Sequence, residues 1–240
     1  MKSPKILIYD IETSPNLAYV WGKWQQNVIA FEKQRELLCY AYKWLGDRKV
    51  QYNTKESRAN DKALVRSLAN LLNEADIVVA HNGDEFDRKV LKARMLYWNM
   101  DPLKINCSVD TKKAAKSYFS FNGNSLADLC EYLGIGKKAH TPGFDMWLGC
   151  IRDNPRSWAQ MVHYNKRDVV LLEKLYKRLQ PWVENHPNIA KILLKDSNRQ
   201  CPICLSEKVI KNGVRATSAA VTQRWDCLSC GKKFTTRMGK

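Results

Sequence analysis

The feature that most constrains this sequence is a short apolar run that ends in two acidic residues, Asp10 and Glu12. Residues 5–9 read KILIY and are apolar on both faces, as in a strand covered on both sides of a sheet. Side chains at positions i and i+2 share a face, so the two acids continue the row of Ile6 and Ile8. Two carboxylates in a buried row are costly unless a cation lies between them. The alternative is a strand that emerges into solvent at Asp10, and these residues alone do not decide between the two.

The rest of the first 180 residues alternates between strand and helix patterns. Further strands are predicted at 36–45, 48–53, 76–80 and 105–110, and helices at 61–74, 85–99, 125–133 and 155–179. The first three strands are expected to form an antiparallel meander. The glycine-rich segment 134–146 is expected to be a mobile loop, and 180–199 a short helix or linker. The fold class is therefore α/β, a mixed five-stranded sheet flanked by helices.

A second acidic group follows the strand at 76–80. Residues 81–90 read HNGDEFDRKV and place Asp84 and Asp87 where a strand turns into a helix. Ligands of open α/β sheets usually bind at such carboxyl ends. The structural alternatives are that Asp84 caps the helix and that Asp87 only complements the helix dipole.

A third acidic residue, Asp168, lies on the apolar stripe of the helix at 155–179. The stripe carries Met161, Leu172, Leu175 and Leu179, and Asn165 falls on it too. Tyr164 stands four residues before Asp168, so the two side chains are neighbours on the helix. A charged residue inside a core stripe is unusual and favours a functional role.

These three elements together resemble the three motifs of the DEDD exonuclease superfamily, over roughly residues 5–180. DIE is similar to motif I, HNGDEFD to the N-x-x-x-F-D form of motif II, and Y-x-x-x-D to motif III of the tyrosine (DEDDy) subclass. The most similar forms are the proofreading domain of family B DNA polymerases and stand-alone bacterial and phage nucleases. The resemblance implies a ribonuclease-H-like fold and 3′–5′ exonuclease activity.

The resemblance also implies roles for single residues. Asp10, Glu12 and Asp168 would hold one Mg²⁺ or Mn²⁺, and Asp10 and Asp87 the second, in a two-metal mechanism. Asp87 is preferred to Asp84 because the F-D pair matches the motif there. Tyr164 would orient the attacking water. Substrate-binding residues are predicted as Asn82 from the motif, and Lys137 and Lys138 from the basic loop, where a merely solvated loop is the alternative.

The C-terminal part carries two CxxC pairs separated by 22 residues. This spacing predicts a zinc ribbon with one structural Zn²⁺ bound by Cys201, Cys204, Cys227 and Cys230, and a redox pair is the weaker alternative. Trp225 and Phe234 either stack on bases or fill the small core of the ribbon. Cys39, Cys107, Cys130 and Cys150 are expected to be buried free thiols.

Charge favours a polyanionic partner, because the net charge is +16. A merely soluble basic protein is the alternative. No apolar run is long enough for a transmembrane helix, and the N-terminus does not match a signal peptide. We therefore expect a cytoplasmic protein, in the host cytoplasm if the origin is a phage, that binds nucleic acid, DNA rather than RNA, and no membrane. Replication or recombination proteins are possible partners.

The aromatic residues after the first strand allow two interpretations. Tyr19, Trp21, Trp24 and Phe31 either wedge against a terminal base or form an outer packing layer, and packing is the preferred interpretation.

The sequence thus predicts an exonuclease domain at 1–180, a linker at 181–198 and a zinc ribbon at 199–240. The predicted reaction is removal of nucleotides from the 3′ end of DNA, with single strands preferred. Two other functions stay open: a ribonuclease-H-like endonuclease or junction resolvase, and a non-catalytic DNA-binding adaptor.

Overall fold

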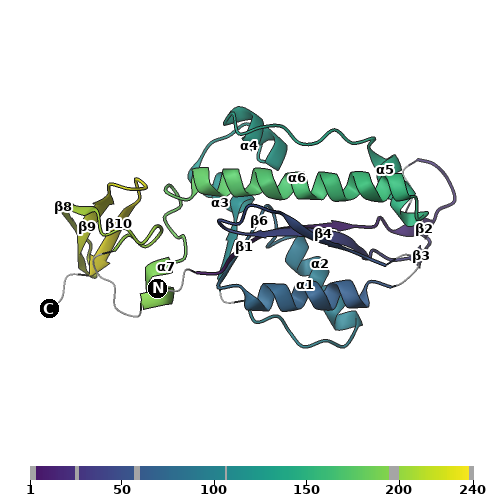
Figure 1. Ribbon diagram of the computed structural model, residues 1–240, viewed down its shortest axis with the longest axis horizontal. Helices are drawn as coiled ribbons and strands as arrows, with labels where there is room; N and C mark the ends of the chain where they lie inside the picture. Colours follow the sequence, from purple (N-terminus) through teal and green to yellow (C-terminus); the bar gives the residue numbers. More distant parts are fainter. Residues whose placement is uncertain (1–3, 25–26, 57–59, 106, 195–199, 238–240) are drawn as a thin grey trace.

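The computed structural model describes residues 4–24, 27–56, 60–105, 107–194 and 200–237 (Figure 1). Its strands are β1 (Ile6–Thr13), β2 (Leu17–Tyr19), β3 (Ala30–Lys33), β4 (Leu37–Trp44), β5 (Gln51–Thr54), β6 (Ile77–Ala80), β7 (Cys107–Asp110), β8 (Val209–Ala216), β9 (Val221–Cys227) and β10 (Lys233–Arg237). Its helices are α1 (Lys62–Glu74), α2 (Asp87–Tyr97), α3 (Thr111–Tyr118), α4 (Leu126–Tyr132), α5 (Phe144–Ile151), α6 (Pro155–Leu179) and α7 (Ile189–Leu194).

The main sheet is mixed, with strand order β5-β4-β1-β6-β7. β1 pairs antiparallel with β4 and parallel with β6, and β6 pairs parallel with β7. The predicted five-stranded mixed sheet and its antiparallel meander are therefore confirmed. Helices α1 and α2 cover one face of this sheet, and α6 with α3 to α5 covers the other (Figure 1).

The two faces of β1 enter different apolar clusters. Leu7, Tyr9 and Ile11 pack with the buried leucines of α1. Ile6 and Ile8 pack with buried residues of α6 such as Leu172. Because side chains alternate along a strand, Asp10 and Glu12 belong to the face that looks toward α6.

Two segments differ from the sequence prediction. Helix α3 was not predicted, although Asp110 caps it by accepting hydrogen bonds from the backbone N–H groups of Lys112 and Lys113. The segment 134–146 is not a loop throughout, because α5 begins at Phe144. The side chains of Met146 and Cys150 are buried against α6, and this tertiary packing holds a helix that the local sequence did not suggest.

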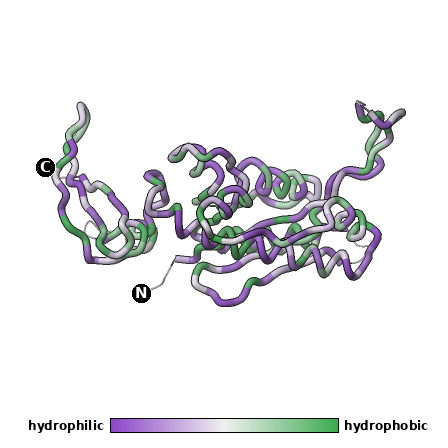
Figure 2. The backbone as a smooth tube through the Cα atoms, turned by 90° about the horizontal axis from the view of Figure 1, so that it is seen from above, coloured by the Kyte–Doolittle hydropathy of each residue, from purple (hydrophilic) through white to green (hydrophobic). Residues whose placement is uncertain are grey.

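The aromatic segment after β1 forms an arm, defined here as residues 17–24 and 27–33, built on the β2–β3 hairpin. It projects at one end of the molecule, on the right in Figures 1 and 2. Trp21 is 89% exposed, and Tyr19, Trp24 and Phe31 are exposed as well. The preferred interpretation as a packing layer was wrong, because all four of these side chains are at least half exposed in the described structure.

The four cysteines lie in a small three-stranded sheet of order β10-β9-β8 at the opposite end of the molecule (Figure 1). Leu205 packs against the apolar cluster of Ile6 and Ile8, and hydrogen bonds also join this part to the rest of the described chain. The N–H of Ile189 donates to the carbonyl of Pro202, and Lys232 Nζ donates to the carbonyl of Val183 at 2.6 Å. Among the described residues, no helix is long and apolar enough to cross a membrane.

Candidate active site

The predicted acidic residues come from three elements that meet at one end of β1. Asp10 and Glu12 lie on β1, Asp87 is the first residue of α2, and Asp168 is in the middle of α6. Asp87 and Asp168 are buried, although both are charged residues. Each of the four is close enough to others of the set to raise a neighbour's pKa. The fold thus brings these carboxylates together.

Asp10 lies at the centre of this group. Asn165 Nδ2 donates to Asp10 Oδ2 at 2.7 Å and to the Asp10 carbonyl at 3.2 Å. Burial, followed by repulsion from Asp87, Glu12 and Asp168, raises the pKa of Asp10 well above its usual value. No role was predicted for Asn165 from the sequence, although a polar residue within an apolar stripe, three positions before Asp168, is a signal for one. It positions the central carboxylate.

The ionised forms of Glu12 and Asp87 are also destabilised in the absence of a cation. Burial is the main reason that the pKa of Glu12 rises to about 8 and that of Asp87 to about 7. The N–H of Ile11 donates to Asp87 Oδ1 at 3.3 Å, which ties the start of α2 to β1. Asp84 is engaged differently, because it accepts from Arg88 Nη1 at 2.8 Å and from Ser108 Oγ at 3.1 Å.

Asp168 is held by a lysine from the loop before α5. Lys138 Nζ donates to Asp168 Oδ2 at 2.6 Å and to Tyr164 Oη at 3.0 Å. Burial alone would lower the pKa of Lys138, but the adjacent Asp168 more than offsets this and raises it. Burial raises the pKa of Asp168 despite this ion pair, and its Oδ1 is buried without a hydrogen-bond partner.

The residues present fit divalent metal ions. The donor set is made of carboxylate oxygens, which hard cations prefer, and one of those oxygens is buried and unpartnered. Repulsion within the set and its burial both disfavour ionised carboxylates, and bound cations would relieve both. No three carboxylates in the described part of the chain bring their oxygens as close together as the cysteine sulfurs do.

Two other predicted substrate-binding residues, Asn82 and Lys137, contact neither the four carboxylates nor Tyr164 in the hydrogen bonds and ion pairs that the structure records. Asn82 adopts a left-handed backbone with φ of 67°, and its N–H donates to Asp110 Oδ1 at 2.9 Å. This backbone turns the chain between β6 and α2. Lys137 extends into solvent and pairs with Glu131 at 3.5 Å, while the Lys137 carbonyl accepts from Arg167 Nε.

The four C-terminal cysteines form a second candidate site. Their sulfurs all lie within 4.8 Å of one another, with the Cys201–Cys230 and Cys204–Cys227 pairs each at 3.6 Å. Burial would raise the pKa of Cys227, but hydrogen bonds from the N–H groups of Cys230 and Ser229 lower it to about 7. Four such sulfurs fit a zinc ribbon.

Comparison with known proteins agrees with this architecture. A family model described as the RNase H superfamily matches residues 7–180. A DNA polymerase III of PolC type from Ureaplasma parvum is 33% identical over 72 residues, which cover 29% of this chain and 5% of the polymerase.

Among solved structures, the family B DNA polymerase from the archaeon Pyrobaculum calidifontis is similar with a TM-score of 0.59 and 16% identity. The similarity covers 80% of this chain and 27% of the polymerase, so this chain spans a small part of each polymerase. At this identity the likeness establishes a shared fold.

Proposed function

Because the chain belongs to the RNase H superfamily, we propose that it is a metal-dependent 3′–5′ exonuclease that hydrolyses phosphodiester bonds at the 3′ end of DNA. One observation carries this proposal: carboxylates from β1, α2 and α6 converge, those of Asp87 and Asp168 are buried, and desolvation raises the pKa of each member of the set. A structural role for such a set is improbable on energetic grounds, since isolated buried anions are costly.

The metal ligands in this proposal are the carboxylates themselves. Asp10, Glu12 and Asp168 would hold one Mg²⁺ or Mn²⁺, and Asp10 with Asp87 the other. When bound, such ions lower the pKa of water and neutralise charge on the phosphate. Asn165 keeps the carboxylate of Asp10 oriented, and the N–H of Ile11 does the same for Asp87.

Tyr164 and Lys138 would act on the water and the phosphate. Burial raises the pKa of Tyr164, so its hydroxyl keeps its proton at neutral pH. It therefore orients a water molecule by hydrogen bonding rather than removing its proton. Lys138 carries a permanent positive charge beside Tyr164 and Asp168, where it can pair with a phosphate oxygen.

DNA is the proposed substrate, with single strands preferred. The net charge of +16 favours a polyanion, and both similar proteins reported above are named DNA polymerases. The exposed basic Lys137 lies on the same loop as Lys138, where it can contact the phosphate backbone.

The test is digestion of 5′-labelled DNA and RNA oligonucleotides with Mg²⁺ or Mn²⁺. The wild-type chain should give a ladder of single-nucleotide steps on DNA, and Asp10→Ala with Glu12→Ala should abolish it. Loss of a metal ligand removes several kcal/mol of transition-state stabilisation, or about 10³-fold in rate. The matched control is Glu56→Ala with Glu74→Ala, two exposed acids outside the site, which should leave the ladder intact.

Two results would contradict the proposal. Degradation that persists in the Asp10→Ala, Glu12→Ala variant would place the active site elsewhere. Cleavage of circular single strands would instead support the endonuclease alternative, because a circle offers no 3′ end.

A further inference from the structure

The aromatic arm has no role in the chemistry described above. Its exposed large side chains include Tyr19, Val20, Trp21, Ile29 and Phe31. So many exposed apolar residues in one short hairpin are unusual and mark an interaction surface. We therefore expect the arm to bind a ligand.

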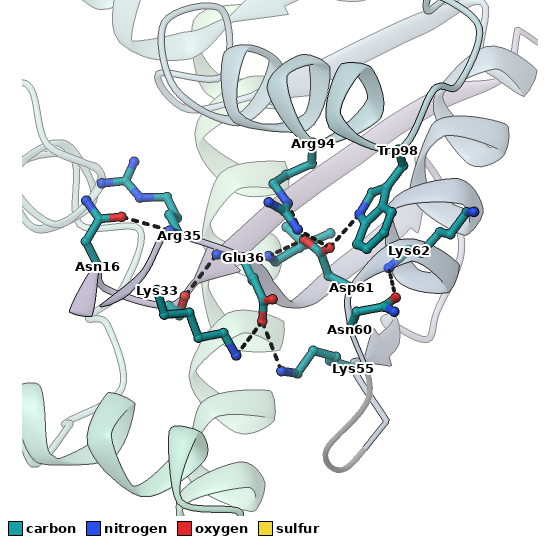
Figure 3. Close-up of polar contacts among 12 residues, drawn as sticks. Asn16, Lys33, Arg35, Glu36, Lys55, Asn60, Asp61, Lys62, Arg94 and Trp98 are labelled. Atoms are coloured by element: carbon teal, nitrogen blue, oxygen red, sulfur yellow. Dashed lines mark hydrogen bonds and ion pairs between the residues drawn. The ribbon is translucent and has the colours of Figure 1, made fainter. Parts of the chain in front are cut away.

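Hydrogen bonds and ion pairs hold the root of the arm, residues 14–16 and 33–36 (Figure 3). Asn16 Oδ1 accepts from the N–H of Arg35 at 2.8 Å, and Ser14 Oγ accepts from the N–H of Glu36 at 2.9 Å. The Glu36 carboxylate pairs with Lys33 at 3.0 Å and with Lys55 at 3.2 Å. Both strands of the arm are thus tied together before they enter the main sheet.

A buried network next to this root connects it to the helices (Figure 3). Asp61 is fully buried and accepts from the N–H of Leu37 at 2.9 Å. It also accepts from Arg94 Nη2 at 2.7 Å and from Trp98 Nε1 at 2.8 Å. The arm is therefore anchored to α1 and α2 at its base, while its aromatic residues stay exposed.

The root also adjoins the candidate active site. β2 begins five residues after Glu12 on the same chain segment, from 12 to 17. The Arg35 guanidinium lies 5.3 Å from the centre of the Phe86 ring, and Phe86 directly precedes Asp87. The chain therefore leads directly from the carboxylates into the arm, and the root of the arm contacts the residue before Asp87.

The arm offers aromatic rings on both of its faces. Ala18 pairs with Phe31 and Tyr19 pairs with Ala30, so Tyr19 and Phe31 point to opposite faces. Tyr19 is hydrogen-bonded to Glu32 on its own face, which helps to orient the phenol ring. Lys23 and Arg35 add positive charge, and the root acid Glu36 is already paired with two lysines. Exposed rings interleaved with cations are typical of surfaces that bind single strands.

We propose that the arm binds the unpaired strand next to the scissile 3′ end, with bases stacked on Trp21 and Phe31. This proposal rests on the proposed nuclease function and specifies its substrate as a single strand several nucleotides long. Stacking on aromatic rings tolerates every base, as removal of successive nucleotides requires. A protein partner is the competing occupant, but continuity with the carboxylates and the strongly basic chain favour nucleic acid.

The test measures binding of the full chain, with its zinc site intact, to fluorescent oligothymidylates of 3 and 20 nucleotides. Ca²⁺ in place of Mg²⁺ or Mn²⁺ suppresses hydrolysis, so the result does not depend on activity. Trp21→Ala together with Phe31→Ala should weaken binding of the 20-mer about 10-fold or more, from the stacking lost per base. The affinity difference between the 20-mer and the 3-mer should shrink accordingly. Leu96→Ala, which removes an exposed apolar side chain of α2, is the matched control and should bind like the wild type.

Two further variants separate stacking from apolar docking. Trp21→Phe should keep most of the affinity, whereas Trp21→Leu should lose it, because leucine is apolar but has no π face. Equal affinity of the alanine variant and the wild type for the 20-mer would overturn the proposal. Tolerance of leucine, or dissociation of a self-associated form by the arm variants in light scattering, would overturn it in favour of a protein partner. An inactive wild type that still shows arm-dependent binding would instead refute only the nuclease function.

Discussion

The two candidate metal sites of this molecule are assembled in opposite ways. The cysteine sulfurs all come from residues 201–230, and the apolar cluster of this part has three buried members among the described residues, Cys201, Ile203 and Cys227. The carboxylate site joins parts of the chain that are 155 residues apart, as the Asn165–Asp10 hydrogen bond shows. Large apolar clusters on both faces of the main sheet hold that site in place.

This contrast suggests different relations between metal and fold. A part with so little core cannot balance its conformational entropy, so a bound ion has to supply the folding free energy. At the carboxylate site the apolar core supplies the free energy of folding. The same fold holds the acidic groups close together, and their repulsion and desolvation lower the stability. We therefore expect that the fold creates the carboxylate site, and that a bound ion stabilises the fold of the C-terminal part.

The largest expected effect is on the ribbon. Removal of the metal with a chelator, or the substitution Cys204→Ser, should unfold residues 200–237 and leave the main sheet folded. Binding of a structural Zn²⁺ contributes on the order of 10 kcal/mol, far more than the small core provides. Amide hydrogen exchange should show loss of protection in β8 to β10 but not in β1 or α6.

Cys107→Ser is the matched control, because Cys107 is a partly buried free cysteine outside the cluster. It should keep protection in both sheets. If the metal-free ribbon kept its protected amides, the contrast between the two sites would not hold.

A smaller effect is expected from pH on the metal-free carboxylate site. The pKa values of Glu12 and Asp87 are raised to about 8 and about 7, so the folded state binds protons that the unfolded state has already released. Stability should therefore fall by about 1–2 kcal/mol as pH rises from about 6.5 to about 8. Urea unfolding at several pH values measures this slope, and EDTA keeps the carboxylate site free of metal. Amide exchange in α6 follows the unfolding of the main sheet separately from that of the ribbon.

Substitution tests the origin of that slope. Glu12→Gln removes a titrating group and should flatten the pH dependence, while the exposed Glu85→Gln should leave it unchanged. Saturating Mg²⁺ should abolish the slope, because bound cations keep the carboxylates ionised. If the pH dependence of stability were unchanged in Glu12→Gln, the pKa of Glu12 would not be raised in the folded state.

The smallest effect concerns the contact between the two parts. Lys232 is buried and donates to the Val183 carbonyl, and burial lowers the pKa of this lysine. Lys232→Met keeps the aliphatic packing but loses the hydrogen bond, at a cost of about 1 kcal/mol. NMR relaxation should then report a ribbon that tumbles more independently, with Lys233→Met as the exposed control. Equal tumbling in both variants would mean that other contacts fix the ribbon, and the predicted boundaries at residues 180 and 199 would need revision.

Much of the fold was predictable because its signals are local. The both-face apolar run at Ile6–Ile8 identified the central strand, and the stripe of α6 identified a helix that buries Asn165 and Asp168. The CxxC spacing predicted a compact cluster that the structure bears out. Helix α5 was not predicted, because its stability comes from Met146 and Cys150, which pack on residues far away in the sequence such as Leu38.

Within the candidate site, the sequence supplied the residue types but not their neighbours. It indicated Asp10, Glu12, Asp87 and Asp168 as the acidic site residues, and the structure brings them together. It did not anticipate that Lys138 would bond to both Asp168 and Tyr164, or that Asn165 would hold Asp10. Such contacts depend on how a loop and a helix pack across the sheet, and no local pattern encodes them.

By itself, the sequence determined the strand and helix pattern, the acidic and cysteine residues and the positive charge, since each is a property of short segments or of composition. Only the tertiary structure decided that Trp21 and its neighbours form an exposed arm rather than a packing layer. The physical reason is that burial is a relation between segments: an aromatic run looks the same in sequence whether another element covers it or not.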